Sequence, residues 1–372
     1  MVDYLDPRSG QTWSLAVPRW CGDSHQPLTL TPGPGLRAAD IDTSVRSLWR
    51  YRRAFALPHT LPITMGEGCT PLLKRTLHGG IAHLKCEWFM PTGSFKDRGA
   101  SVMLSMLRAQ GISAVLEDSS GNGGAAISAY AAAGGMKATI MAPSSTSPAK
   151  TVQMRAHGAT VELIPGTRQD TSAAAEARAD SIFYASHNWH PFFLEGTKTL
   201  AYELWEDLGF RAPDHVIVPC GAGSNVLGCW IGFSDLLRTG AIDRMPRIWA
   251  AQPLKCGPIA AAALGLETAP IQPTIAEGTA IAAPIRLPEV VAALHNSGGG
   301  AILLSEEEIA DEVLHLARLG LYVEPTCAQA AVAFGALQAA GRIAPSDIAV
   351  VVLTGTGLKT TPRIADLLGA PL

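Results

Sequence analysis

The stretch Pro91-Thr92-Gly93-Ser94-Phe95-Lys96-Asp97-Arg98-Gly99-Ala100 places one lysine in a turn of glycine and serine, directly before a run that favours a helix. A lysine held rigidly in such a turn is partly removed from water, which favours the neutral amine and makes Lys96 a usable nucleophile. Taken alone, the stretch fits an ion-paired lysine at a helix start better, because most lysines are of that kind. The rest of the chain reverses this preference.

The composition is that of a folded protein with two lobes. The chain has 372 residues, of which 47% are hydrophobic and 16% charged, as is typical of a well-buried globular protein. The formal net charge is -3 and no basic block occurs, so nucleic acid is not expected as a partner. Residues 1–10 lack the apolar core of a secretion signal, and no apolar run has transmembrane length. We therefore expect a cytoplasmic protein without a membrane partner.

Metal and disulfide chemistry are weakly supported. The seven cysteines are scattered and form no Cys-x-x-Cys pair, so free thiols in a reducing compartment are expected rather than a disulfide framework or a zinc knuckle. His187 and His190 flank Trp189 and could ligate a metal, but no carboxylate and histidine pattern accompanies them. We predict no metal.

The order of hydrophobic runs predicts an α/β fold. Residues 1–65 are rich in proline and are interpreted as an N-terminal extension that packs on the large domain, with a helix at 44–55. Residues 66–372 form the expected catalytic region, with a small subdomain at about 98–195 and a large domain from the remainder. Strands are expected at 81–85, 113–116, 138–141, 160–164, 215–218, 247–251 and 348–353, and helices at 124–133, 149–157, 199–208 and 306–319.

Three glycine-rich segments each follow an expected strand: 119–124, 221–225 and 354–357. Ligands bind at the carboxyl ends of strands in open α/β sheets, so three such segments indicate a shared cleft. The segment 221–225 can offer consecutive backbone N–H groups to a phosphate, although a ligand-free strand–helix turn fits it equally well. Its spacing fails the Gly-x-Gly-x-x-Gly pattern of a dinucleotide site.

The other two segments suit an organic ligand. Residues 119–124 place two hydroxyls, an amide and backbone N–H groups at a helix start, which is a cradle for a carboxylate. Thr354 follows a hydrophobic strand and could direct its hydroxyl at a heterocycle nitrogen. The alternative, that Thr354 bonds its own backbone, is favoured when this residue is taken alone.

Together these motifs resemble the fold-type II enzymes that use pyridoxal 5′-phosphate (PLP), and the threonine synthase branch most closely. The stretch 91–99 is similar to that family's Schiff-base motif. The other matching segments, in the family's order, are Gly-Glu-Gly-Cys-Thr-Pro-Leu at 66–72, Ser-Ser-Gly-Asn at 119–122, Glu-Gly-Thr-Lys-Thr at 195–199, Ile-Ala-Glu-Gly at 275–278, Val-Glu-Pro at 323–325 and Leu-Thr-Gly-Thr-Gly-Leu-Lys at 353–359. The resemblance implies a two-lobed α/β fold of mostly parallel sheets flanked by helices, and a homodimer.

The resemblance also implies the site residues. Lys96 would form the Schiff base with the cofactor, and Phe95 would line the cofactor ring. Asn122 would bind the ring hydroxyl, and Thr354 would face the ring nitrogen. The cofactor phosphate would be held by Gly221, Ala222, Gly223, Ser224 and Asn225, and the substrate carboxylate by Ser119, Ser120 and Gly123.

The departures from the family bear on the substrate. Threonine synthases read Asn-Ser-x-Asn-Pro-x-Arg before Glu-Gly-x-Lys-Thr, whereas this chain reads His187-Asn188-Trp189-His190-Pro191-Phe192-Phe193. His187, Asn188 and Phe193 therefore stand at the substrate site, and Phe193 replaces the arginine that helps to bind a substrate phosphate. Losing that guanidinium removes charge-assisted hydrogen bonds to a dianion. Of the family's cysteine-rich knuckle only Cys21 remains, so zinc is not expected.

We therefore predict a PLP-dependent lyase that eliminates or replaces a β- or γ-leaving group on a small amino acid, with an altered site for the substrate phosphate. Three alternatives within the class stay open: a true threonine synthase, which converts O-phosphohomoserine to threonine and phosphate, a threonine or serine dehydratase, and a deaminase similar to diaminopropionate ammonia-lyase. A binding protein without PLP, from a different class, is disfavoured because the residue types that contact the cofactor are intact, and a nucleotide-binding dehydrogenase is disfavoured further.

Overall fold

In the computed structural model, residues 2–58, 60–146 and 148–370 are described. Their contacts divide the chain into two compact units. Unit 1 comprises Met1–Gly68 with Lys96–Thr199, and unit 2 comprises Cys69–Phe95 with Leu200–Leu372. The chain therefore passes from unit 2 to unit 1 between Phe95 and Lys96, inside the lysine turn.

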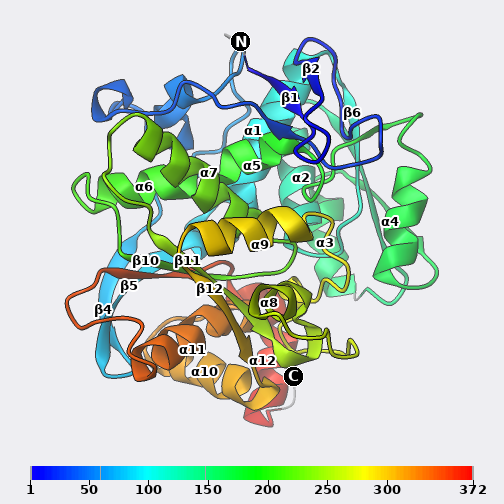
Figure 1. Cartoon of the computed structure of the whole chain (residues 1–372). Helices are drawn as coiled ribbons and strands as arrows, with labels where there is room; N and C mark the ends of the chain where they lie inside the picture. The colour runs from blue at the N-terminus through cyan, green and yellow to red at the C-terminus, as the bar shows by residue number, and fades with distance from the viewer. Residues whose placement is uncertain (1, 59, 147, 371–372) are drawn as a thin grey trace. The chain divides into compact units, whose positions relative to one another are not determined.

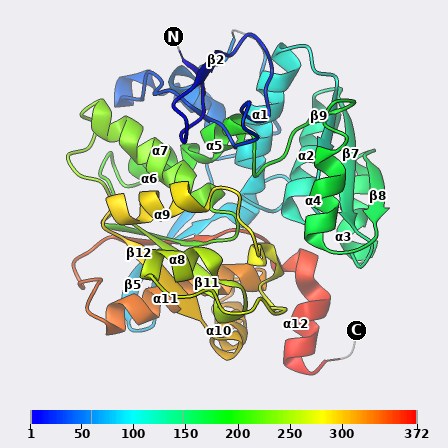
Figure 2. The same ribbon diagram turned by 45° about the vertical axis from the view of Figure 1, so that its right-hand side comes forward.

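Unit 1 contains a four-stranded parallel sheet in the order β8-β7-β6-β9, with helices beside it (Figure 2). Parallel strands need crossover connections, and the alternation of hydrophobic strand and alanine-rich helix in the sequence supplies them. The strands are β6 (Ala114–Glu117), β7 (Lys137–Pro143), β8 (Thr160–Ile164) and β9 (Phe183–Tyr184). The helices are α1 (Lys96–Ala109), α2 (Asn122–Ala133), α3 (Pro148–Ala156), α4 (Arg168–Glu176) and α5 (Pro191–Thr197).

The N-terminal extension belongs to unit 1, whereas the sequence pattern predicted that it packs on the large domain. It forms a small antiparallel sheet of β1 (Asp3–Leu5), β2 (Thr12–Ser14) and β3 (Thr29–Leu30). Its large side chains explain the placement, because Tyr4, Trp49 and Phe55 are buried in one core with residues of α1 and α2. Burying such aromatic area is a strong driving force for docking.

The helix predicted at 44–55 is wrong in type and length. The structure has only a 3-10 helix, Leu48–Ala54, which begins where the Ser47 side chain accepts a hydrogen bond from the Trp49 N–H and is kinked at Tyr51. Short 3-10 turns are typical of chain that packing shapes more than helix propensity does.

Unit 2 is built on a six-stranded sheet in the order β12-β11-β10-β13-β5-β4, in which only β4 is antiparallel to its neighbour. Its strands are β4 (Leu72–Leu77), β5 (Gly80–Cys86), β10 (His215–Pro219), β11 (Arg247–Pro253), β12 (Gly300–Leu304) and β13 (Ala349–Leu353). Every residue of β10 and β13 is buried, as expected for central strands covered on both faces.

Helices lie on both faces of this sheet, with α9 on one side and α10 and α11 on the other (Figure 1). The helices are α6 (Thr199–Asp207), α7 (Ser224–Arg238), α8 (Pro258–Leu264), α9 (Leu287–Asn296), α10 (Glu306–Arg318), α11 (Pro325–Ala339) and α12 (Thr361–Leu368). None of the helices among the described residues is long and apolar enough to cross a bilayer. The predicted α/β class with mostly parallel sheets flanked by helices is confirmed.

Candidate active site

In unit 1, Lys96 is the first residue of α1 and lies against an aromatic ring. Its Nζ is 5.5 Å from the centroid of the Phe193 ring, which comes from α5. Two glycines allow this approach of α1 and α5. A Cβ on Gly99 would come within 2.4 Å of the Phe193 ring, and a Cβ on Gly196 would come within 2.0 Å of the Arg98 carbonyl oxygen. Packing therefore requires glycine at Gly99 of the lysine stretch and at Gly196 of the Glu-Gly-Thr-Lys-Thr segment.

The predicted carboxylate cradle lies where β6 ends and α2 begins. Gly121 is the N-cap residue of α2, and space around its Cα is open, because an added Cβ there would meet no atom within 4 Å. Gly123 is closely covered: its Cβ would lie 2.8 Å from Ser119 Oγ and 3.0 Å from the His187 ring. Ser119 is buried, and Ser120 and Asn122 are half-buried. A helix N-terminus with open space before it suits a carboxylate.

His187 is one half of a buried pair with Glu117, the last residue of β6. His187 Nδ1 lies 2.6 Å from Glu117 Oε1, and the His187 backbone N–H donates to Glu117 Oε2 at 3.0 Å. The His187 ring also packs at 5.6 Å, centroid to centroid, from the Phe193 ring. The structure thus brings together three predicted residues, Lys96, His187 and Phe193, with Glu117, which the sequence pattern missed.

Burial sets the charge of this pair. It raises the pKa of Glu117 to about 8, and burial together with the Lys96 charge holds the pKa of His187 well below its usual value. Well below pH 8 the pair therefore carries no net charge, with one proton shared between the carboxyl group and Nδ1.

We expect Glu117→Gln to flatten the pH dependence of stability. The pKa of Glu117 is 4.5 in an unfolded reference and about 8 in the fold. The stability that protonated Glu117 contributes is therefore complete below pH 4.5 and is lost as the pH rises through about 8. Above about pH 7 His187 is mostly neutral in both states, because its pKa is 6.5 in an unfolded reference and lower in the fold, so the wild-type free energy of unfolding should fall by at most about 1.4 kcal/mol per pH unit on account of Glu117.

Urea unfolding of both proteins between about pH 7 and 8 measures this slope. Glu162→Gln, which changes a half-buried carboxyl on β8, is the control and should keep the wild-type slope. Equal slopes for the wild type and Glu117→Gln would show that Glu117 is ionised throughout this range.

The turn that carries His187 and Asn188 is fixed by Asp118. The Tyr184 hydroxyl donates to Asp118 Oδ1 at 2.7 Å, and the Ser186 hydroxyl donates to the same oxygen at 3.2 Å. Asn188 is half-buried, and its backbone N–H donates to Ser186 Oγ at 3.4 Å. These bonds hold the loop after β9 against the end of β6, and so position the His187 ring over Gly123.

In unit 2, the predicted phosphate loop has the shape of an anion nest. Residues 221–225 follow β10, and Gly223 caps α7 with a left-handed φ of 92°, a conformation that favours glycine. A Cβ on Gly221 would crowd the Gly278 carbonyl oxygen at 3.2 Å. The Asn225 side chain is 3% exposed, and neither its amide oxygen nor its nitrogen has a hydrogen-bond partner. An unpartnered buried amide at a helix N-terminus fits a ligand with phosphate oxygens.

Thr354, the first residue after β13, lies at the same edge of the sheet as this loop, because β10 and β13 are parallel neighbours. Its carbonyl oxygen accepts a hydrogen bond from the Phe95 N–H at 3.0 Å, which places Phe95 beside it. The Thr354 hydroxyl donates to Glu324 Oε1 at 3.3 Å, a side-chain partner and not its own backbone. Its direction toward a ring nitrogen stays a prediction.

Comparison with known proteins identifies the family of this chain. Residues 63–355 match the model of the family described as pyridoxal-phosphate dependent enzyme. The threonine synthase of Methanocaldococcus jannaschii is 33% identical over 84% of this chain and 80% of its own length. The threonine synthase of Mycobacterium tuberculosis (strain H37Rv) is 35% identical over 80% of this chain and 84% of its own.

Solved structures support the fold. Maize serine racemase matches with a TM-score of 0.66 at 22% identity, covering 81% of this chain and 92% of that chain. O-ureido-L-serine synthase matches with a TM-score of 0.69 at 21% identity, covering 83% of this chain and 96% of that chain. The chain therefore belongs to the pyridoxal-phosphate dependent enzyme family, as a lyase similar to threonine synthases that uses pyridoxal 5′-phosphate as its cofactor.

Proposed function

We propose that this enzyme eliminates or replaces a β- or γ-leaving group on a small amino acid, and that the leaving group is not a simple phosphate ester. The observation that supports this most is Phe193, whose buried ring lies against Lys96 and His187 at the position where the resembling family has arginine. The Glu117–His187 pair beside it is neutral well below pH 8 and so does not attract a dianion.

Each predicted residue has a role in this proposal. Lys96 Nζ would hold the cofactor covalently and, once displaced, would take the proton from the substrate Cα. By the resemblance, residues 221–225 would bind the cofactor phosphate, Phe95 would line its ring, Asn122 would bind the ring hydroxyl and Thr354 would face the ring nitrogen. Ser119, Ser120 and the Gly123 N–H receive the substrate carboxylate, with Asn188 at the edge of the same region. The bound cofactor supplies an electron sink for the pair of electrons left at Cα.

Threonine synthase activity is the second candidate. The curated relatives at 33% and 35% identity are threonine synthases. The charge of Arg168, at the start of α4, favours the ionised form of Glu117 and the neutral form of His187, although burial has the larger effect on both, so a guanidinium of unit 1 acts on the pair. In that case Arg168 would bind the substrate phosphate in place of the arginine missing at position 193.

A substrate screen separates the candidates. The holoenzyme is incubated with O-phosphohomoserine, threonine, serine and diaminopropionate, and phosphate, threonine, ammonia and 2-oxo acid are measured. The proposal expects ammonia and 2-oxo acid, or a replacement product, from one of the other amino acids. Brisk phosphate release with threonine formation, lost in Arg168→Gln, would establish threonine synthase instead.

We expect Phe193→Arg to raise kcat/KM for O-phosphohomoserine. A charge-assisted hydrogen bond of about 1.5–3 kcal/mol corresponds to an increase of about ten- to a hundredfold. Phe193→Leu is the control, since it opens the same space without a charge and should give no increase. An equal response to both substitutions would mean that space, not charge, limits the phosphate substrate.

The proposal includes a homodimer in the cytoplasm, as the resemblance and the seven free cysteines suggest. Light scattering on the purified holoenzyme measures the oligomeric state.

A further inference from the structure

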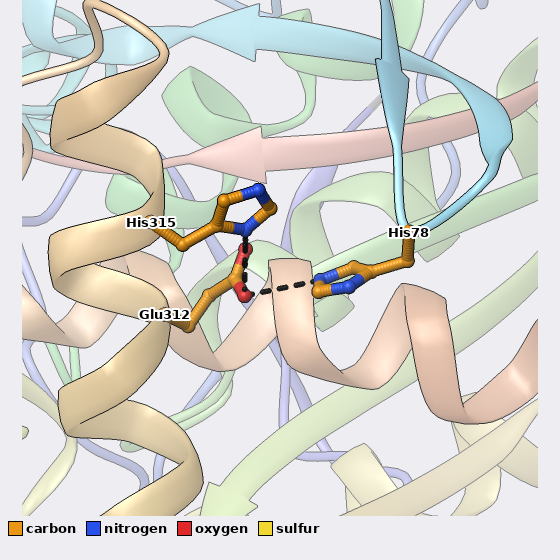
Figure 3. A group of neighbouring side chains, drawn as sticks. All are labelled: His78, Glu312 and His315. Carbon is orange, nitrogen blue, oxygen red and sulfur yellow. Dashed lines mark hydrogen bonds and ion pairs between the residues drawn. The ribbon is translucent and has the colours of Figure 1, made fainter.

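Three potential metal ligands meet in unit 2, and none of them has a role in the proposed reaction. His78 lies at the turn between β4 and β5, and Glu312 and His315 lie on α10 (Figure 3). His78 Nε2 is 3.0 Å from Glu312 Oε2, and His315 Nδ1 is 3.2 Å from the same oxygen. All three ligand atoms lie within 4.8 Å of one another.

The backbone holds both parts of this cluster in place. Glu312 and His315 are three residues apart and so share a face of α10, whose start is fixed by a capping box of Ser305 and Glu308. His78 has a left-handed φ of 48° and Gly79 has one of 78°, the conformation of a tight two-residue hairpin turn. The turn therefore fixes the His78 backbone so that its ring reaches Glu312.

The His78 ring packs against α11 at Gly335. A Cβ on Gly335 would lie 3.0 Å from two atoms of the His78 ring, so only glycine lets the ring approach α11 this closely. The Glu312 side chain is 5% exposed, while those of His78 and His315 are 31% and 39% exposed. A buried carboxylate thus stands between two histidines that solvent can reach, which gives an ion an entry path.

We propose that His78, Glu312 and His315 bind one divalent transition-metal ion of the zinc class. Imidazole nitrogens with one carboxylate are a ligand set that zinc accepts, with a fourth position left for water or a small anion. Zinc ligands at about 2.0–2.2 Å in a tetrahedron lie about 3.3–3.6 Å from one another. The two histidine–carboxylate separations, 3.0 and 3.2 Å, are slightly shorter than this, so a modest outward rotation of the rings completes the geometry.

The bound ion would join the β4–β5 hairpin to α10. The ion replaces a hydrogen-bonded cluster in which both histidines contact one carboxylate, and its binding stabilises the folded chain by an amount that grows with the logarithm of the free zinc concentration once that concentration exceeds Kd. Because no residue of the cluster binds the cofactor or substrate in the proposed function, metal binding and turnover can be measured separately.

Zinc titration of the chelator-treated holoenzyme tests the site. Calorimetry gives the affinity, elemental analysis gives the bound zinc per chain, and thermal unfolding gives the stabilisation. Co²⁺ serves as the second probe, because its spectrum distinguishes nitrogen and oxygen ligands from the thiolates of the seven cysteines. We expect one zinc per chain, a cobalt spectrum without thiolate bands and a higher unfolding temperature.

Three variants locate the ion: His78→Asn, Glu312→Gln and His315→Gln. Loss of an outer-shell partner weakens metal affinity by about 10–100-fold, and we expect the loss of a direct ligand to weaken it at least as much. The matched control is His25→Asn. Like His78, His25 has a left-handed φ, of 53°, and its Nε2 lies 3.0 Å from a carboxylate oxygen, that of Glu176. Among the described residues His25 does not belong to a group of three potential metal ligands.

The visible absorbance of the bound cofactor confirms that each variant is folded, and His315→Gln, at a half-buried position, remains informative should the substitution of buried Glu312 unfold the chain. Retained affinity in His315→Gln, a thiolate spectrum with Co²⁺, or a wild type that binds no zinc would each overturn the proposal. A loss in His25→Asn equal to that in the three variants would also overturn it.

Discussion

Lys96→Ala is expected to abolish both the covalent attachment of the cofactor and turnover. A positioned acid–base group contributes about 10²–10⁴-fold to the rate, and Lys96 also carries the cofactor, so we expect kcat to fall by at least about 10³-fold. The visible absorbance of the bound cofactor should change as well, and dialysis should remove the cofactor from the variant faster than from the wild type.

The chain provides its own controls for this assignment. Lys85 and Lys198 are buried in the fold, but each is committed to carboxylates: Lys85 Nζ lies 2.7 Å from Glu203, and Lys198 Nζ lies 2.6 Å from Glu195. Such pairing holds the ammonium form and so disfavours a nucleophilic role. Lys96 is the first residue of α1, and its Nζ lies 5.5 Å from the centroid of the Phe193 ring.

Borohydride reduction followed by peptide mapping decides among the lysines. We expect the label on the peptide that contains Lys96 in the wild type and no label in Lys96→Ala. Lys96→Arg, which keeps the positive charge, should be equally inactive because a guanidinium does not form the covalent link. A label on Lys198 or Lys85 would move the attachment site and refute the assignment.

The local sequence was enough to predict those parts of the site that lie within a single turn after a strand. The segments 119–124, 221–225 and 354–357 follow β6, β10 and β13 in the structure, as expected. Glycines directly after a hydrophobic run indicate that a strand ends in a turn, so the local sequence is enough to predict such a segment. The same holds for the helix that begins at Lys96.

Residues that meet through the topology could not be predicted in this way. Glu117 and His187 are 70 residues apart, and they meet because β6 pairs in parallel with β9, with Leu116 opposite Tyr184. β9 has only two residues, Phe183–Tyr184, too few for an alternating pattern to be recognised. The strand β12 was also not predicted, because it begins at the last of the glycines at 298–300 and glycine is a weak strand signal.

The largest effect on stability is expected from Lys85→Met. The Lys85 side chain is fully buried in β5, and its Nζ donates three hydrogen bonds of 2.7 Å, to Glu203 Oε1, Asp207 Oδ2 and the Thr70 carbonyl oxygen. Removing the ammonium leaves the buried Glu203 carboxylate without its counter-charge. Breaking a buried pair in this way costs about 3–5 kcal/mol, and we expect a loss of that size in the free energy of unfolding.

Urea unfolding of the cofactor-saturated protein measures the loss, with Arg363→Met as the matched control. Arg363 also pairs with a carboxylate, at 3.1 Å from Glu277, but both side chains are more than two fifths exposed, at 44% and 43%. An exposed pair contributes about 0–1 kcal/mol, so the control should be nearly neutral. Equal effects of the two substitutions would mean that solvent reaches Lys85.

The double variant Lys85→Met with Glu203→Leu shows what else the cluster does. Replacing both ions with apolar residues usually recovers most of the loss. Here recovery should be incomplete, because Glu203 also accepts hydrogen bonds from the backbone N–H groups of Cys69, at 2.9 Å, and Thr70, at 2.7 Å. Cys69 and Thr70 belong to the Gly-Glu-Gly-Cys-Thr-Pro-Leu segment, so the double variant tests whether this segment stabilises the fold by binding Glu203 just before β4. Full recovery of stability would show that these two hydrogen bonds contribute nothing to the fold.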